Sequence, residues 1–286
     1  MMEKLIQVGP WIIGYILSDG ARISRLQYGS INILTQEPID FKPPRKDYGL
    51  YETRPVYGYD DCFPSVDECT YPHTDWIIPD HGELCWLPWE VEQNADTLIF
   101  QVKSHKLPVW FIRRLKLCKN RLVWSFSVEN IGDKTLPFQH VMHPLMPLNT
   151  VTDIHLPAFS TVFDAIKKMN MCTKDPETVR QYLLSQPSGS TNMLFLQNIT
   201  NGKMSWNFLN LLQIEATFPL ELFPSIGIWW NNDGYPDENG CRRNECALEP
   251  VPGFNSILSD AYENKLHLAV GPGKKLEWDI VWHVSS

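Results

Sequence analysis

The chain has 286 residues, 43% of them hydrophobic, and a net charge of −8 at pH 7. The acidic balance argues against a nucleic-acid or anionic-membrane partner, because both kinds of partner require a cationic face. No stretch approaches the roughly 20 apolar residues of a membrane-spanning helix. The hydrophobic fraction is ample for a sizeable core, arranged as one large β domain or as two smaller domains.

The N-terminal stretch and the cysteines both indicate a cytoplasmic protein. The opening residues MMEKLIQVGPWIIGYILSDG lack the charged region, the continuous apolar region and the cleavage site of a signal peptide. The seven cysteines are scattered and form no CxxC motif, which is typical of free thiols in a reducing compartment. Cys62 with Cys69, and Cys241 with Cys246, are near enough in sequence to pair, but we expect buried small side chains instead.

The first part of the chain has the pattern of short strands joined by turns. Apolar runs at residues 11–13, 23–28 and 31–34 are strand candidates, and Ser18-Asp19-Gly20 is a turn signal between the first two. The proline-rich, charged stretch from Glu37 to Pro55 is predicted to be a surface loop, because strand patterns resume on both sides of it.

The clearest strand patterns lie at residues 98–102, 109–128 and 276–284. In each of them apolar side chains alternate with polar ones, as in a half-buried antiparallel strand. Residues 118–121 (CKNR) interrupt the second pattern and predict a hairpin there.

Helix signals are sparse. Asp175 and Pro176 predict the N-cap and the first residue of a short helix, which Pro187-Ser188-Gly189 would end. The rest of residues 160–215 gives no clear pattern. Many short strands with turns between them predict an all-β fold, a large antiparallel β-sandwich that occupies residues 1–286 as a single domain.

Three stretches hold residues that are candidates for chemistry, and the first is IPDHGELCWLPWEV at residues 78–91. His81 stands there beside Gly82, between two prolines. Proline fixes φ and glycine permits unusual conformations, so His81 is expected on a loop of defined shape. A lone loop histidine usually only bonds the backbone, but the acidic residues and the tryptophan pair close by favour a site.

The second stretch is QHVMHPLMPLN at residues 139–149, which contains His140 and His143. Residues three apart on a strand face opposite sides, so at most one of the two points at a given site. Each could be a satisfied core histidine. We favour His143 for function, because Pro144 after it suits a strand end at the rim of a sheet.

The third stretch is NECALEPVPG at residues 244–253. Glu249 lies there among apolar residues, where a carboxylate is costly unless it is hydrogen-bonded or takes part in chemistry. An ion pair with Arg242 or Arg243 is the structural alternative, and we favour function.

Other chemistries have weaker signals. The sequence has no HExxH motif, no G-x-S-x-G elbow and no glycine-rich phosphate loop. No metal or other cofactor is therefore expected, although His81, Glu83 and His143 could serve a metal-dependent sugar isomerase. Glu83 with Glu249 could form the carboxylate pair of a glycoside hydrolase, but nothing in the sequence fixes their separation.

Together the three stretches resemble the aldose 1-epimerase, or galactose mutarotase-like, superfamily. The resemblance lies in the order of a His-Gly loop, a His-Pro element after the turn VENIGD, and a Trp-Trp…Glu-Pro element near the end. The segment YGYDDCFPSVDECTYP before His81 also resembles the one that precedes the His-Gly pair in bacterial members. The resemblance covers most of the chain and is weakest at residues 160–215. It implies an antiparallel supersandwich with a sugar cleft on one face.

The resemblance also implies roles for individual residues. At the positions that match the family motifs, Glu249 takes the proton of the anomeric hydroxyl, His143 donates a proton to the ring oxygen, and His81 positions the sugar. Such ring opening needs an acid and a base poised together, and no cofactor. Further sugar contacts are predicted at Asp60, Asp61, Glu83, Trp86 and Trp230, with one of the tryptophans stacked on the sugar.

The chain departs from galactose mutarotases at some positions. It reads His-Gly-Glu where they read His-Gly-Gly, and Leu145-Met146-Pro147 follows His143 where an aromatic residue and an asparagine are usual. We expect an isomerase of the aldose 1-epimerase type that acts on a free hexose or a related small-molecule sugar. The alternatives are a carbohydrate-binding sandwich without catalysis, and a hexose-phosphate epimerase that uses Arg242 and Arg243 for the phosphate.

Overall fold

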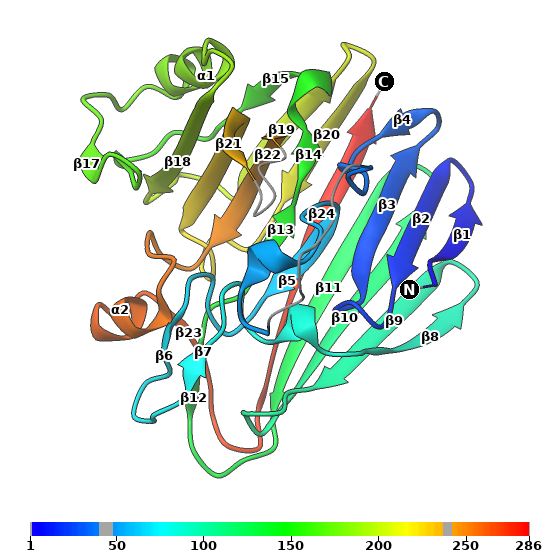
Figure 1. The fold of residues 1–286 in the computed structure, drawn as a ribbon, viewed down its shortest axis with the longest axis vertical. Helices are drawn as coiled ribbons and strands as arrows, with labels where there is room; N and C mark the ends of the chain where they lie inside the picture. Colours follow the sequence, from blue (N-terminus) through cyan, green and yellow to red (C-terminus); the bar gives the residue numbers. More distant parts are fainter. Residues whose placement is uncertain (1, 40–47, 237–241, 286) are drawn as a thin grey trace.

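The computed structural model describes residues 2–39, 48–236 and 242–285, which form three large β-sheets, two small ones and two short helices (Figure 1). The strands within the large sheets pair antiparallel. The all-β, antiparallel sandwich that the sequence predicts is therefore confirmed. No helix in the described part of the chain is long and apolar enough to cross a membrane.

The largest sheet has eight strands in the order β15-β19-β20-β24-β11-β10-β9-β8. Its strands are β8 (Glu90–Asn94), β9 (Thr97–Lys103), β10 (Val109–Cys118), β11 (Arg121–Asn130), β15 (Val151–His155), β19 (Lys203–Phe208), β20 (Leu212–Thr217) and β24 (Lys275–Ser285). The predicted hairpin is β10–β11, and the predicted last strand is β24. Apolar side chains at alternate positions of β11 and β24 are buried, so this sheet presents one face to the core.

Two six-stranded sheets lie next to each other and meet where the chain passes from one to the other. The first contains β1 (Lys4–Val8), β2 (Trp11–Ile16), β3 (Arg22–Tyr28), β4 (Ile31–Asn32), β5 (Tyr59–Cys62) and β13 (Val141–Pro144). The second contains β14 (Met146–Pro147), β16 (Thr161–Asp164), β17 (Met169–Asn170), β18 (Ser190–Gln197), β21 (Ser225–Pro236) and β22 (Arg242–Val251). Only Leu145 separates β13 from β14, so the two sheets adjoin at this point (Figure 1).

Small elements complete the fold. The remaining strand pairs are β6 (Cys69–Thr70) with β7 (Ile77–Ile78), and β12 (Leu136–Phe138) with β23 (Leu268–Val270). The helices are α1 (Pro176–Leu184), α2 (Leu258–Glu263) and the 3-10 turns η1 (Tyr51–Thr53), η2 (Leu84–Trp86) and η3 (Leu148–Thr150).

Helix α1 begins where the sequence predicts. The carboxylate of Asp175 accepts hydrogen bonds from the backbone N–H groups of Glu177 and Thr178, and Pro176 occupies the first helical position. The helix ends at Leu184, three residues before Pro187. Helix α2 had no signal in the sequence analysis.

A core of buried apolar side chains extends from Trp11 to Val284 between the sheets. Most of the eleven tryptophans are structural, as the sequence suggests. Those in this core are Trp11, Trp89, Trp124, Trp206, Trp230, Trp278 and Trp282.

The prediction of a surface loop from Glu37 to Pro55 is wrong for its second half. Tyr51 and Arg54 are each 1% exposed. The Arg54 guanidinium pairs with Asp19 and Asp60 inside the protein, so the charge that suggested a surface position is neutralised within the fold. Residues 40–47 of this stretch lie outside the described residues.

The cysteines that the structure describes are free thiols. Cys62, Cys85 and Cys246 are buried, whereas Cys172 is exposed. Cys62 and Cys69 do not form a disulfide, as expected, and Cys241 lies outside the described residues.

Candidate active site

A cavity of about 330 Å³ lies at the junction of the two six-stranded sheets. Its size is at the lower end of the usual range for small-molecule sites. Most of the residues that line it come from η1, from the loops at residues 66–67 and 80–81, and from β13, β18, β21 and β22. His81, His143 and Glu249, the three residues to which the sequence assigns chemistry, all line this cavity.

His143 and Glu249 form a direct pair across the junction of the sheets. His143 lies on β13 opposite Asp60, and Glu249 lies on β22 opposite Gly227. The Nδ1 atom of His143 is 2.5 Å from Oε1 of Glu249, and the two side chains are 11% and 5% exposed. An imidazole and a carboxylate, nearly buried and in contact, can exchange a proton and can each act on a bound molecule.

The loop around His81 holds the second imidazole against this pair. His81 and Gly82 have φ values of 60° and 74°, and a side chain at position 82 would lie 2.0 Å from the carbonyl oxygen of Phe63. Only glycine fits there, because it has no Cβ atom. This shaped turn, which the sequence predicts, brings the His81 and His143 rings to a centroid distance of 5.1 Å.

The neighbours of His81 favour its charged form. Its Nδ1 atom is 2.8 Å from Oδ1 of Asp80. Burial opposes protonation, but the charge and the hydrogen bond of Asp80 outweigh burial and raise the pKa of His81 above its ordinary value. Protonated His81 presents a hydrogen-bond donor to the cavity.

Tyr51 packs against His81 and is held in place by the buried Asp60. Its hydroxyl donates to Oδ2 of Asp60 at 2.8 Å, and Asp60 pairs with Arg22 and Arg54. Burial and the nearby Asp60 carboxylate raise the pKa of Tyr51 well above its ordinary value, so the hydroxyl keeps its proton. Tyr51 was not among the predicted site residues, because the charged, proline-rich stretch around it has the composition of a surface loop.

The opposite wall carries an aromatic surface and a charged cluster. The Trp229 and Tyr235 rings meet edge to face at 5.7 Å, and the Trp229 indole N–H donates to Glu245 at 3.2 Å. Arg243 pairs with Glu52 at 3.2 Å and with Glu245 at 3.4 Å. Arg243, one of the two candidate ion-pair partners of Glu249, thus pairs with Glu52 and Glu245 instead.

Asp60 and Asp61, which the sequence assigns to sugar binding, do not line the cavity. Both are 1% exposed. Asp61 accepts hydrogen bonds from Arg113 at 2.5 Å and from Tyr59 at 2.5 Å, and it bonds His140 at 2.9 Å. Buried arginines balance the charges of both aspartates. The two side chains therefore have structural partners outside the cavity.

Glu83, Trp86 and Trp230 do not line the cavity either. The Glu83 carboxylate is fully buried and bonds the hydroxyl of Ser104. Trp86 packs against a small cluster that includes Tyr51, and Trp230 is 2% exposed in the main core. These three expected sugar contacts therefore lie outside the lining of the cavity.

Trp229, and not its neighbour Trp230, lines the cavity. Successive strand residues face opposite sides, and Trp229 lies two positions from Gly227, which pairs with Glu249. Trp229 therefore lies on the same face of the sheet as Glu249. The pairing of β21 with β22 is the information that would have identified it.

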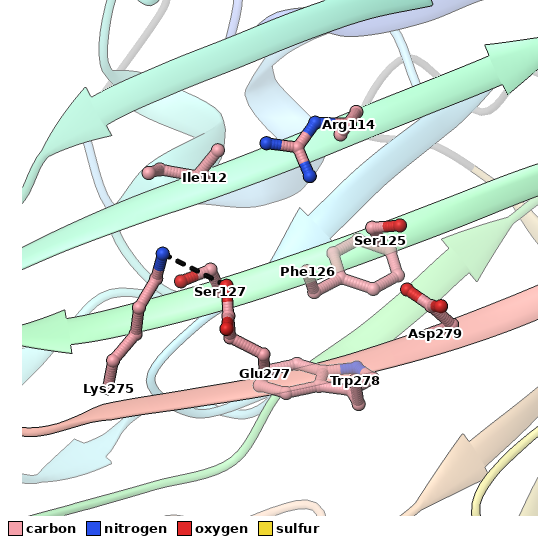
Figure 2. Close-up of a pocket in the computed structure, with 9 residues that line it drawn as sticks. All are labelled: Ile112, Arg114, Ser125, Phe126, Ser127, Lys275, Glu277, Trp278 and Asp279. Carbon is pink, nitrogen blue, oxygen red and sulfur yellow. Dashed lines mark ion pairs between the residues drawn. The ribbon is translucent and has the colours of Figure 1, made fainter.

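Another hollow, of about 380 Å³, lies on the outer face of the eight-stranded sheet (Figure 2). Arg114 and Asp279 project there, and Lys275 pairs with Glu277 at 2.9 Å. It contains no imidazole and has the mixed charges of a solvated sheet face, so the cavity with the histidines is the better candidate.

The sequence itself matches no protein-family model, and no curated protein is significantly similar to it. Solved structures of similar fold do exist. A galactose mutarotase related enzyme from Lactobacillus acidophilus is 18% identical, with a TM-score of 0.70 over 100% of this chain and 98% of that chain. A galactose mutarotase-like protein from Clostridium acetobutylicum is 15% identical, with a TM-score of 0.69 over 100% and 99% of the two chains.

A protein from Synechocystis is 17% identical and has a TM-score of 0.75 over 99% of this chain and 96% of that chain. At these identities the likeness concerns the arrangement of the strands, and it extends over whole chains. The chain has the galactose mutarotase-like β-sandwich fold.

Proposed function

We propose that the protein is an aldose 1-epimerase, which interconverts the α and β anomers of an uncharged sugar. The observation that carries this proposal is the contact between His143 and Glu249, 2.5 Å apart in a cavity of about 330 Å³. A bound sugar would find a base and an acid side by side there, which is what ring opening requires.

The reaction follows from the two partners. Glu249 takes the proton of the anomeric hydroxyl while protonated His143 donates a proton to the ring oxygen. The bond between the anomeric carbon and the ring oxygen breaks, and the carbonyl of the open-chain aldehyde forms. Rotation about the adjacent carbon–carbon bond presents the other face of the carbonyl, and the reverse proton transfers close the ring.

The two proton transfers of ring closure restore the pair. After ring opening Glu249 holds a proton and His143 has lost one. On closure Glu249 returns its proton to the carbonyl oxygen, and His143 takes the proton of the hydroxyl that re-forms the ring. Each turnover therefore ends with both groups as they began, without net exchange of protons with bulk water.

The surrounding residues position the sugar. His81, whose pKa is raised mainly through Asp80, is suited to donate a hydrogen bond to a sugar oxygen. Trp229 offers a ring face for the C–H side of the sugar.

The charges of the described lining favour an uncharged substrate. Arg243 is the sole arginine or lysine of that lining, and it is already paired with two carboxylates. The acidic residues of the lining are Glu52, Asp67, Asp80, Glu245 and Glu249. A phosphate would meet this excess of negative charge, so a free sugar fits better than a hexose phosphate.

Polarimetry tests the proposal. Freshly dissolved α-anomers of glucose, galactose and further aldoses are followed with wild type, Glu249→Gln and the surface variant Glu215→Gln as control. We expect wild type and the control to accelerate equilibration, and Glu249→Gln to be slower by a factor of about 10²–10⁴. Equal rates for wild type and Glu249→Gln would exclude the proposed base. Sugar binding without acceleration by wild type would favour a carbohydrate-binding protein without catalysis.

A further inference from the structure

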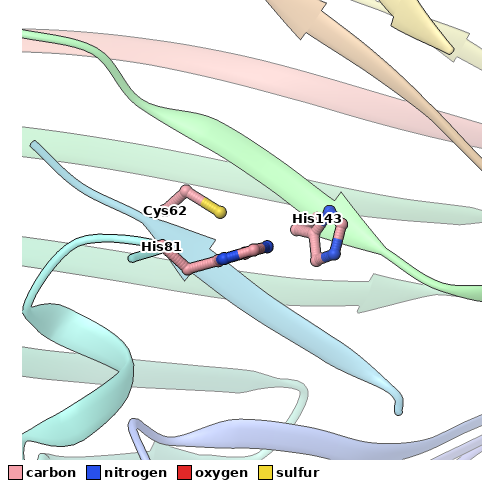
Figure 3. Close-up of side chains that lie close together, drawn as sticks. All are labelled: Cys62, His81 and His143. Carbon is pink, nitrogen blue, oxygen red and sulfur yellow. The ribbon is translucent and has the colours of Figure 1, made fainter. Parts of the chain in front are cut away.

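Three side chains with nitrogen and sulfur donors converge beside the candidate active site. Cys62 on β5, His81 on its loop and His143 on β13 each offer one ligand atom, and these atoms lie within 4.8 Å of one another (Figure 3). Figure 3 shows the Cys62 sulfur and the two imidazoles directed toward a common space.

The donor set suits a zinc-type ion. Thiolate and imidazole are the ligands that Zn²⁺ takes most often, in tetrahedral geometry. Its usual bond lengths place neighbouring ligand atoms about 3.3–3.6 Å apart. The separations here exceed that by no more than about 1.5 Å, which small side-chain rotations can close.

The outer contacts of both histidines match those of metal ligands. Nδ1 of His81 bonds Asp80, and Nδ1 of His143 bonds Glu249. A ligating histidine almost always uses its second nitrogen in this way, which fixes the ring and leaves the first nitrogen for the metal. Nε2 of each ring has no hydrogen-bond partner in the described part of the chain, and neither has the Cys62 thiol.

We propose that Cys62, His81 and His143 bind a zinc-type divalent cation, with its fourth coordination position open to the cavity. The bound ion occupies the nitrogen atoms through which His143 and His81 would donate protons to a sugar, so metal binding and the proposed epimerase reaction exclude each other. The thiol of Cys62 loses its proton to solvent as the ion binds. The ion can enter from the cavity, because His81 and His143 line it, and the carboxylates of Asp80 and Glu249 attract a cation. This set differs from the one considered in the sequence, because Glu83 is directed to Ser104 and Cys62 takes its place.

Metal titration tests this site independently of sugar chemistry. Metal-free wild type, Cys62→Ala, Asp80→Asn and two control variants are titrated with Zn²⁺ by calorimetry and with Co²⁺ by absorption spectroscopy. The controls are Cys246→Ala, which removes another buried thiol, and Cys172→Ala, which removes the exposed one. Circular dichroism melting verifies that each variant is folded.

We expect wild type and both controls to bind one ion per chain, with the charge-transfer absorption of a thiolate bound to cobalt. Cys62→Ala should lose that absorption and bind Zn²⁺ at least about tenfold more weakly, and Asp80→Asn about 10- to 100-fold more weakly.

The proposal is overturned if wild type binds no zinc, or if Cys62→Ala binds it as tightly as wild type. Absence of the thiolate–cobalt absorption in Cys172→Ala overturns it as well, and that readout needs no change at the site itself. Because the titration reads the metal directly, a negative polarimetry result leaves its outcome intact.

Discussion

The ring of Tyr51 lies flat on the imidazole of His81, with centroids 3.7 Å apart and an angle of 10° between the planes. The tyrosine is held in turn by Asp60, and Asp60 by two buried arginines. A continuous series of contacts therefore leads from the core to a loop histidine. We infer that the orientation of His81 depends in part on Asp60 and its arginine partners, which lie outside the lining of the cavity.

Replacement of the Tyr51 ring should impair catalysis through His81. Tyr51→Leu removes a stacked pair worth about 0.5–1.5 kcal/mol, so we expect kcat/KM for mutarotation to fall roughly 2- to 12-fold. Tyr51→Phe keeps the ring and should stay closer to wild type, because Arg22 and Arg54 still pair with Asp60. Polarimetry of both variants, with melting curves to verify folding, makes the comparison; equal losses would argue against stacking.

The neighbouring tryptophans Trp229 and Trp230 should respond in opposite ways to substitution. Trp229 lines the cavity and is only partly buried, so Trp229→Ala mainly removes the proposed stacking surface, and sugar affinity should fall by about 0.5–1.5 kcal/mol. Trp230→Ala opens a cavity in the core and should lower the free energy of unfolding by about 3–5 kcal/mol. Calorimetric sugar titration and urea unfolding measure the two effects. A larger affinity loss for Trp230→Ala would contradict the assignment.

Asp61 should contribute to stability and not to ligand affinity. Its substitution by Asn leaves the buried Arg113 guanidinium without its counter-charge, which should lower the free energy of unfolding by about 3–5 kcal/mol. Glu277→Gln, at the exposed pair with Lys275, is the control and should stay within about 0.5 kcal/mol. Denaturant unfolding gives both values. Unchanged stability together with lost sugar affinity would restore the expectation drawn from the sequence.

The pair of Asp153 and Arg180 should make stability depend on pH. Burial opposes ionisation of Asp153, but the hydrogen bond from Arg180 outweighs it and lowers the pKa of Asp153 below the ordinary value of 3.8. A lowered folded-state pKa gives stability that is present above the unfolded-state pKa and is lost as pH falls through the folded-state pKa.

Arg180→Gln should therefore cost up to about 1 kcal/mol at neutral pH and progressively less as the solution is acidified below the ordinary pKa. Urea unfolding across this acidic range provides the measurement. Lys203→Gln, at an exposed ion pair with Glu215, should show little effect at any pH. A cost that stays constant on acidification would assign the contribution of Arg180 to packing.

The sequence predicted the helices and strands whose formation depends on residues close to one another in the chain. The Asp175 cap, the β10–β11 hairpin and the alternation in β24 each depend on residues close in sequence, and each is present. The order of the His-Gly, His-Pro and Glu-Pro stretches predicted the fold and three residues of the cavity lining.

Contacts between residues that are far apart in the sequence could not be predicted. Asp61 and Glu83 look like surface or ligand-binding groups in the sequence, because their partners Arg113 and Ser104 are 52 and 21 positions away. The choice between Trp229 and Trp230 depends on how β21 pairs with β22, since a shift of one residue reverses the face. Such information becomes available only when the sheets are assembled.

The site has a consequence for how the chain folds. His143 and Glu249 are 106 positions apart and belong to different sheets, so their contact closes one of the long loops of the molecule. Contacts between distant segments carry a larger loop-closure cost than a hairpin such as β10–β11, and they form more slowly. A refolding chain should regain its hairpins before this pair, so the return of function would report the docking of two sheets in real time.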